Sequence, residues 1–220
     1  MSEKSLRYPL LERHYQQYLD DEDSARFIHQ VTSHYMPATL ERLVGSCRPS
    51  TRRAAVLAIG YICDYSSNET IGLALSDKDR AVRMLAEHNI RQIWLRQGTS
   101  HEQTMLLKLE SLNATKQPKR AVSHATELIR TNAQLCEAWN QRAVAHSFQG
   151  NLGQAISDCR ETLNCNRYHF PAAVGMGHCL LKLNDPCGAL HSFRLALRIN
   201  PDLESLRLQV RRLEKILKDN

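Results

Sequence analysis

Apolar residues recur along most of this chain at intervals of three and four, and short clusters of turn residues separate the segments that carry them. Near the C-terminus, Leu206, Val210 and Leu213 fall at i, i+4 and i+7, with charged residues on another face. This spacing predicts an amphipathic helix over 202–217, because a period near 3.6 gathers one stripe on one side. A similar stripe predicts a helix over 9–19. We therefore expect an all-α protein.

From residue 102 onward the chain aligns with itself at an offset of 34 residues without gaps. An internal period of this length indicates stacked helix–turn–helix units, each of which buries its apolar face against the next. We predict three such units in the region 102–220, at 102–135, 136–169 and 170–203, with the C-terminal helix as a cap. The residues in register are Ala121 with Ala155 and Ala189, Val122 with Ile156 and Leu190, and Ile129 with Leu163 and Leu197.

Two of these units carry a recognisable pattern. The third has Ala173, Gly177, Leu180, Ala189, Phe193, Ala196 and Pro201, and the second has Trp139, Ala143, His146, Gly150, Ala155, Cys159 and Thr162. The pattern resembles the tetratricopeptide repeat (TPR). Its small residues let two helices approach closely, and an aromatic ring fills the space beside them. The first unit departs from it, with Met105 and Leu109 at the aromatic and glycine positions, and Arg142 replaces a usual leucine.

The N-terminal half has a different period. Residues in two segments match at an offset of 31, namely Arg52, Ala55 and Ile59 with Arg83, Ala86 and Ile90. A helix that opens on Arg-Arg or Val-Arg, followed by an Asp turn at Asp64 or Asp77, resembles the short bacterial HEAT-like repeat of phycobiliprotein lyases. The resemblance implies, within region 1–97, hairpins at about 22–46 and 48–76, a further first helix at 80–95, and the helix at 9–19 as an N-terminal cap.

The junction between the two repeat types is short. Only Gln97–His101 separates them, which is too little for an independent flexible linker. A helix at 103–114 stands where the last HEAT-like unit needs its second helix. We expect this helix to complete that hairpin and also to open the first TPR unit. The fold class that follows is an alpha-alpha superhelix, a right-handed solenoid in which the HEAT-like half is continuous with the TPR half.

Composition excludes several classes of protein. Apolar residues make up 42% and charged residues 24%, so the chain can bury a core and is not disordered by composition. No apolar run approaches the roughly 18 residues of a membrane span, and the N-terminus lacks the apolar core of a secretory signal. We expect a cytoplasmic protein. Residues 99–220 hold 16 Lys+Arg against 11 Asp+Glu, a modest basic bias.

Seven cysteines, an odd number with no CxxC pair, are typical of reduced thiols in helix cores rather than of a disulfide framework. The sequence spacing of Cys159, Cys165 and His169 matches no known zinc-binding motif, and Cys187 and His191 do not complete one. Gly-rich phosphate loops, HExxH and nucleophile-elbow motifs are absent from the sequence. We therefore expect no catalytic residue, no metal and no cofactor.

The remaining place for function is the concave groove that the first helix of each TPR unit lines. The resemblance assigns to it Leu106, Glu110 and Asn113 in the first unit, Asn140, Val144, Ser147 and Phe148 in the second, and Val174, His178, Leu181 and Lys182 in the third. Five of these side chains are apolar, and an apolar strip facing solvent indicates a surface that a partner buries. Alternatively, the HEAT-like half or the C-terminal helix covers the strip.

Individual positions refine this hypothesis. TPR domains that hold chaperone C-terminal carboxylates use a clamp of Lys and Asn, and of the clamp positions only Lys182 is retained here. We therefore do not expect a chaperone-tail clamp. His178 is a possible ligand contact, and His146 is expected to be a half-buried ring with its hydrogen bonds satisfied. Arg142 is either a snorkelling side chain at the core edge or a charge held for an acidic partner.

The favoured function is a non-catalytic adaptor that binds a protein or peptide partner, as an extended peptide or a helix, in the TPR groove. We expect a monomer or a weak dimer. Nucleic-acid backbone binding by the HEAT-like half is an alternative, with Arg52, Arg53, Arg83, Arg91 and Arg96 as candidates, although that half is nearly neutral. A bilin-lyase-like accessory role is a further alternative, which rests on the fold resemblance alone.

Overall fold

The computed structural model describes residues 9–218, and throughout this range every regular element is helical. The all-α prediction is confirmed. The chain divides into two compact units, one up to Ile93 and one from Trp94 onward. The helices of the first are α1 (Leu10–Asp21), α2 (Ser24–His34), α3 (Pro37–Val44), α4 (Pro49–Ile62), the 3-10 turn η1 (Tyr65–Ser67), α5 (Asn68–Ala74) and most of α6 (Arg80–Leu95). Those of the second are α7 (Ser100–Ala114), α8 (Pro118–Thr131), α9 (Cys136–Phe148), α10 (Leu152–Cys165), α11 (Phe170–Lys182), α12 (Pro186–Ile199) and α13 (Glu204–Lys218).

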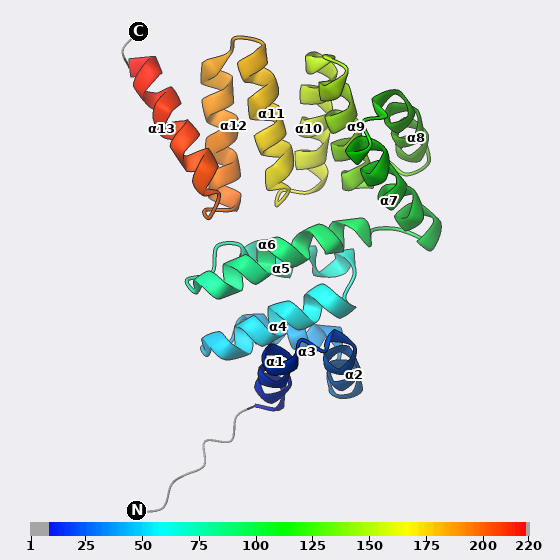
Figure 1. Ribbon diagram of the computed structural model, residues 1–220, viewed down its shortest axis with the longest axis vertical. Coiled ribbons are helices and arrows are strands. Elements are labelled where there is room, and N and C mark those ends of the chain that lie inside the picture. Colours follow the sequence, from blue (N-terminus) through cyan, green and yellow to red (C-terminus); the bar gives the residue numbers. More distant parts are fainter. Residues whose placement is uncertain (1–8, 219–220) are drawn as a thin grey trace, which may run out of the picture. The chain divides into compact units, whose positions relative to one another are not determined.

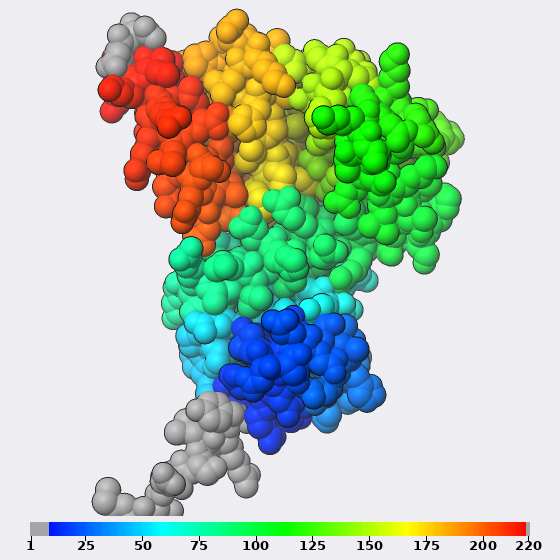
Figure 2. All heavy atoms as spheres, viewed as in Figure 1, coloured from blue at the N-terminus to red at the C-terminus, as the bar shows by residue number. Residues whose placement is uncertain are grey.

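The C-terminal unit is a stack of helix hairpins. Successive helices from α8 to α13 pack against one another in chain order, as Figure 1 shows for α10 to α13. The helices α8, α10 and α12 begin at Pro118, Leu152 and Pro186, at intervals of 34 residues. On the face visible in Figure 2, side chains fill the spaces between α11, α12 and α13.

Local chemistry sets the hairpin turns. The Asp185 carboxylate accepts a 2.8 Å hydrogen bond from the Gly188 amide and so caps α12, which begins on a proline. The preceding helix ends in a left-handed residue, Asn184, with φ 58°. Gly150 occupies the equivalent position after α9 with φ 78°, a conformation that costs glycine little.

A close helix contact in the stack joins α11 to α12. Gly177 of α11 faces the ring of Phe193 of α12, and a Cβ atom at this glycine would lie 2.3 Å from a ring carbon. Phe193 has no exposed surface and packs in a cluster with Ala173, Ala189 and their neighbours. The small residue therefore allows the approach, and the aromatic ring fills the space that it leaves.

The last helix closes this stack. Leu206, Val210 and Leu213 of α13 are buried in the same cluster as Phe193, with Leu217 packed against them. The charged residues between them lie on the exposed face of α13. The stripe seen in the sequence is thus the packed face of the helix.

The first hairpin of the C-terminal unit is held at its start by a capping box. The Thr99 hydroxyl and the Glu102 carboxylate cap each other's backbone amides at the beginning of α7. Gln103 donates hydrogen bonds to the carbonyls of Arg96 and Gly98. The helix α7 packs against α8 and α9. Its second role, completing a HEAT-like hairpin in a continuous solenoid, stays a prediction.

Arginines anchor the helix starts of the N-terminal unit with a geometry that recurs at an offset of 31. Arg52 Nη1 donates to the backbone carbonyls of Ser46 and Cys47, six and five residues earlier. Arg83 Nη1 donates to the carbonyls of Asp77 and Lys78 at the same spacing. The period in the sequence therefore corresponds to a repeated contact, although the likeness to HEAT-like repeats remains an interpretation.

One cysteine prediction is wrong. Cys136 at the start of α9 and Cys165 at the end of α10 form a disulfide, with Cα atoms 5.6 Å apart. Cys63, Cys159 and Cys179 are buried and outside any disulfide, whereas Cys47 and Cys187 are exposed. Hairpin geometry brings the start of one helix beside the end of its partner, so two cysteines 29 residues apart can form a disulfide although no sequence motif indicates it.

Reduction of this disulfide is expected to lower the free energy of unfolding by roughly 2–4 kcal/mol, since the bond restricts a loop of about 30 residues in the unfolded chain. Cys136→Ser/Cys165→Ser should reproduce the loss and remove the sensitivity to reductant. Urea unfolding, followed by tryptophan fluorescence with and without a phosphine reductant, measures both. Equal midpoints for oxidised and reduced wild type would contradict the prediction.

Among residues 9–218, no helix is both long enough and apolar enough to span a bilayer.

Candidate functional site

A pocket of about 180 Å³ opens between α9 and α11 in the C-terminal unit. Five of the eleven groove residues expected from the sequence line it: Asn140, Val144, Ser147 and Phe148 from α9, and His178 from α11. The remaining lining is small or apolar, namely Ala143, Cys159, Pro171, Gly175 and Cys179. The two helices are the first helices of successive hairpins, so the pocket lies where the repeat pattern places a groove.

Small side chains make the floor of the pocket, and one aromatic ring stands at its rim. Ala143, Cys159 and Cys179 are buried, and burial raises the pKa of the Cys159 thiol to about 12, so it is not a reactive thiolate. Phe148 keeps 58% of its surface exposed, which makes it one of the largest exposed apolar side chains in the described range. An exposed ring beside an apolar hollow suits burial by a partner.

A buried polar network supports the pocket from the N-terminal end of α9. Glu137 accepts from Asn140 at 2.9 Å and from Gln141 at 2.7 Å, and its other oxygen lies 2.9 Å from His169 Nε2. His169 Nδ1 accepts the Ala172 amide at the start of α11, so Nε2 carries the proton and donates to Glu137. This network fixes the side chain of Asn140 in the wall of the pocket.

The pair of Glu137 and His169 is almost fully buried, and the ring of His169 stacks on Trp94 with centroids 4.1 Å apart. Burial by itself raises the pKa of Glu137. The hydrogen bonds that Glu137 accepts from His169 and from the two amides outweigh burial and leave the pKa of Glu137 below its usual value. Glu137 is therefore an ionised, fully paired carboxylate.

His178 presents its ring at the exposed side of the pocket, in edge-on contact with Phe193 at 5.1 Å. Partial burial, and then the positive charge of Lys182 one turn later, lower the pKa of His178 below its usual value of 6.5. The ring is therefore neutral at pH 7 and can donate or accept a hydrogen bond at the pocket edge.

Three predicted groove residues lie in the core or against it. Leu106 has no exposed surface and packs in the core that α7 shares with α8 and α9, so its expected place in the groove is wrong. Val174 and Leu181 are partly buried against the cluster that includes Leu206 and Val210 of α13. The alternative in which the C-terminal helix or the HEAT-like half covers the strip stays a prediction.

Of the other predicted groove residues, one is buried and hydrogen-bonded and two are exposed outside the pocket. Asn113 is buried and donates hydrogen bonds to the backbone and side-chain oxygens of Gln141. Glu110 and Lys182 are exposed. Asn113 thus links α7 to α9, while the pocket itself is confined to α9, α10 and α11.

Arg142, which departs from the repeat pattern in unit two, forms an ion pair. Arg142 binds both oxygens of Asp158 at 2.8 Å, and its guanidinium lies 4.7 Å from the centre of the Trp139 ring. Arg142 is therefore not held for an acidic partner. His146 is buried as expected, but its Nδ1 has no hydrogen-bond partner, so the prediction of a satisfied ring is wrong for this atom.

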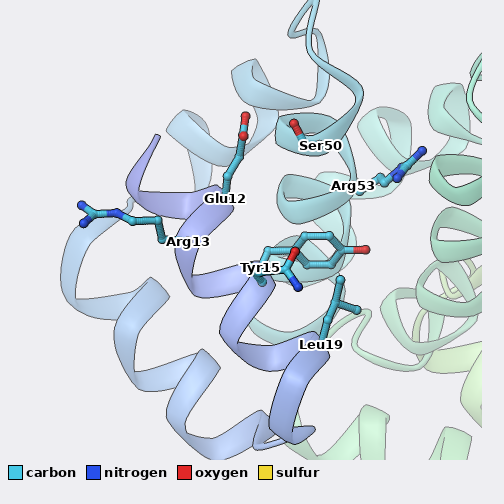
Figure 3. Close-up of a pocket in the computed structure, with 7 residues that line it drawn as sticks. Glu12, Arg13, Tyr15, Leu19, Ser50 and Arg53 are labelled. Atoms are coloured by element: carbon cyan, nitrogen blue, oxygen red, sulfur yellow. The ribbon is translucent and has the colours of Figure 1, made fainter. Parts of the chain in front are cut away.

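A larger cavity of about 440 Å³ lies in the N-terminal unit between α1 and α4. Figure 3 shows Glu12, Tyr15 and Leu19 on α1 facing the helix that carries Ser50 and Arg53. Two of its charged groups are already engaged, because Glu12 is paired with Arg48 and hydrogen-bonded to Thr51, and Arg53 is paired with Asp79. The sequence pattern gave no sign of this cavity.

Three of the five arginines proposed for nucleic-acid contact have structural roles. Arg52 forms a bidentate pair with Asp77 at 2.8 Å and is buried, and Arg53 forms another with Asp79. Arg83 donates to backbone carbonyls. Each of these side chains orders a helix start rather than offering its charge to a phosphate.

No group of three or more His, Cys, Asp or Glu side chains within the described range is arranged to hold a metal ion. Cys165 and His169, which the sequence placed in one candidate set, have different partners. Cys165 is bonded to Cys136, and His169 is bonded to Glu137.

Neither the protein-family models nor the curated proteins contain a match to this chain. Among solved structures, the chain is similar to the TPR domain of Arabidopsis OM64, with 25% identity and a TM-score of 0.50 over 52% of this chain and 95% of that one. It is also similar to the first TPR of Spaghetti (RPAP3), solved with the HSP90 peptide SRMEEVD, with 17% identity and a TM-score of 0.50 over 53% and 93% of the two chains. About half of this chain therefore has the fold of a TPR helical repeat.

Proposed function

We propose that this chain is a non-catalytic adaptor that binds a peptide segment of another protein in the pocket between α9 and α11. The observation that carries the proposal is the exposed ring of Phe148 beside an apolar hollow on the groove side of two successive hairpins. Burying such a surface in a partner is favourable at about 25 cal/mol per Å² of apolar area.

The size of the pocket favours a peptide side chain over a cofactor. Small-molecule sites usually enclose about 300–1,000 Å³, whereas this pocket encloses about 180 Å³. It suits one large apolar side chain of a peptide. The peptide backbone can then meet Ser147 and His178, which are polar groups of the lining outside the Glu137 network.

The groove chemistry differs from that of a clamp for acidic chaperone tails. The resemblance places Leu106, Glu110, Asn140 and Val144 at the other clamp positions, and of these Leu106 is core and Asn140 is already bonded to Glu137. The TPR of Spaghetti was solved with the acidic peptide SRMEEVD. We expect this chain to prefer peptides with a central large apolar residue and to bind SRMEEVD at least tenfold more weakly than such peptides.

Phe148→Asp is expected to abolish peptide binding, because it places a charge at the rim of an apolar pocket. Peptides selected from a random displayed library on the wild-type chain provide the probes, and fluorescence anisotropy measures Kd. We expect a loss of at least fiftyfold. Leu181→Asp would be a poor companion variant, since Leu181 packs on the core.

Leu73→Asp in the N-terminal unit is the matched control. Leu73 is exposed to a similar extent, 62% against 58% for Phe148, and belongs to the other unit. It should leave Kd within twofold of wild type. If both variants lose affinity equally, or Phe148→Asp keeps full affinity, the pocket is not the binding site.

A further inference from the structure

Four polar side chains gather between α1 and α2 in the N-terminal unit, away from the peptide pocket. His14 and Gln17 come from α1, and Gln30 and His34 come from α2, in each case about one helical turn apart. The rings of His14 and His34 lie 5.6 Å apart, and Gln30 Nε2 donates to Gln17 Oε1 at 3.2 Å. The cluster is therefore held by contacts across the two helices.

Two of these side chains, His14 and Gln30, have buried polar atoms that lack a well-formed hydrogen bond. His14 is only 7% exposed, and neither of its ring nitrogens makes a well-formed hydrogen bond, the Gln17 side chain being a weaker partner. Gln30 Oε1 is also buried without one. Unpartnered buried polar atoms are uncommon in folded proteins, and each needs an explanation.

His34 is held in the tautomer of a metal ligand. Its Nδ1 lies 2.8 Å from the backbone carbonyl of Gln30, which can only accept, so Nδ1 carries the proton. The Nε2 atom therefore presents a lone pair. Histidines that bind metals usually donate their other N–H to a carbonyl or carboxylate in this way.

The spacing of the two rings fits a shared ion. With Zn–N bonds of about 2.0–2.1 Å and tetrahedral angles, two imidazole centroids stand about 5 Å apart, close to the observed 5.6 Å. We infer that His14 and His34 form a binding site for a divalent transition-metal ion that imidazole prefers, with Zn²⁺ as its representative. The neighbouring Arg13 charge opposes the cation, so the site is expected to be of moderate affinity.

Isothermal titration with ZnCl₂ tests the site, using the full chain without an affinity tag and with Cys47→Ser/Cys187→Ser to remove the exposed thiols. We expect saturable binding of one ion and at least tenfold weaker binding for His34→Ala. His34 is exposed, so this variant should fold. His34→Cys should restore zinc binding, since a thiolate replaces the imidazole, and a role in packing alone would not give this rescue.

His29→Ala is the matched control, because His29 is an exposed histidine on the same helix. It should bind zinc as the parent does. The inference is overturned if the parent binds no zinc at millimolar concentration, if His34→Ala binds as tightly as the parent, or if His29→Ala loses affinity to the same extent. Peptide binding at Phe148 is independent of all three outcomes.

Discussion

Phe193→Ala is expected to lower the free energy of unfolding of the C-terminal unit by about 3–5 kcal/mol. Phe193 has no exposed surface, and its ring contacts Gly177 at a close approach of α11 and α12. Truncation removes the ring and leaves a cavity that the rigid hairpin cannot close. Both tryptophans of the chain, Trp94 and Trp139, belong to the C-terminal unit, so urea unfolding followed by their fluorescence measures the change.

Phe148→Ala is the control for this prediction. It removes the same ring from a position that is 58% exposed, and it should cost less than about 0.5 kcal/mol. Equal losses for the two variants would mean that Phe193 is not a core residue of the stack.

Glu137→Ala is expected to cost about 3–5 kcal/mol, because it leaves a buried histidine, the buried amide of Asn140 and the partly buried amide of Gln141 without their acceptor. Glu137→Gln is the milder variant, since its amide oxygen can still accept from His169 Nε2. The difference between the two variants separates loss of the acceptor from loss of the charge. The same fluorescence-detected urea unfolding measures both.

The stabilising effect of the Glu137 charge should depend on pH. The pKa of Glu137 is lower in the folded chain than its usual value of 4.5, so its ionised form stabilises the fold. This contribution is present above pH 4.5 and is lost as the pH falls from 4.5 through the folded-state pKa. The gap in stability between wild type and Glu137→Gln should therefore be largest near pH 7 and narrow below pH 4.5. A gap that widens in acid would contradict the assignment.

Periodicity predicted most of the helices, because the apolar stripe of a helix is a local property. The 34-residue offset anticipates the starts of α8, α10 and α12, and the stripe of Leu206 and Val210 anticipates the packed face of α13. The likeness to TPR structures agrees with the pattern at Gly177 and Phe193.

Side-chain partners were harder to predict. Leu106 was expected in the groove and is core. The repeat register places a residue on a helix, but whether its side chain is buried depends on the sizes of the side chains around it. Cys136 and Cys165 meet across a hairpin. Glu137 gave no signal, because a glutamate in the first turn of a helix ordinarily faces solvent, and only its distance from His169 shows its role.

The most direct test of the central claim is to map a selected peptide onto the isotope-labelled chain by NMR chemical-shift perturbation. The account predicts that the largest shifts fall on the backbone amides of Val144, Phe148 and His178, around the pocket between α9 and α11. Shifts centred instead on Tyr15, Leu19 and Arg53, around the cavity of Figure 3, would contradict it and assign binding to the N-terminal unit.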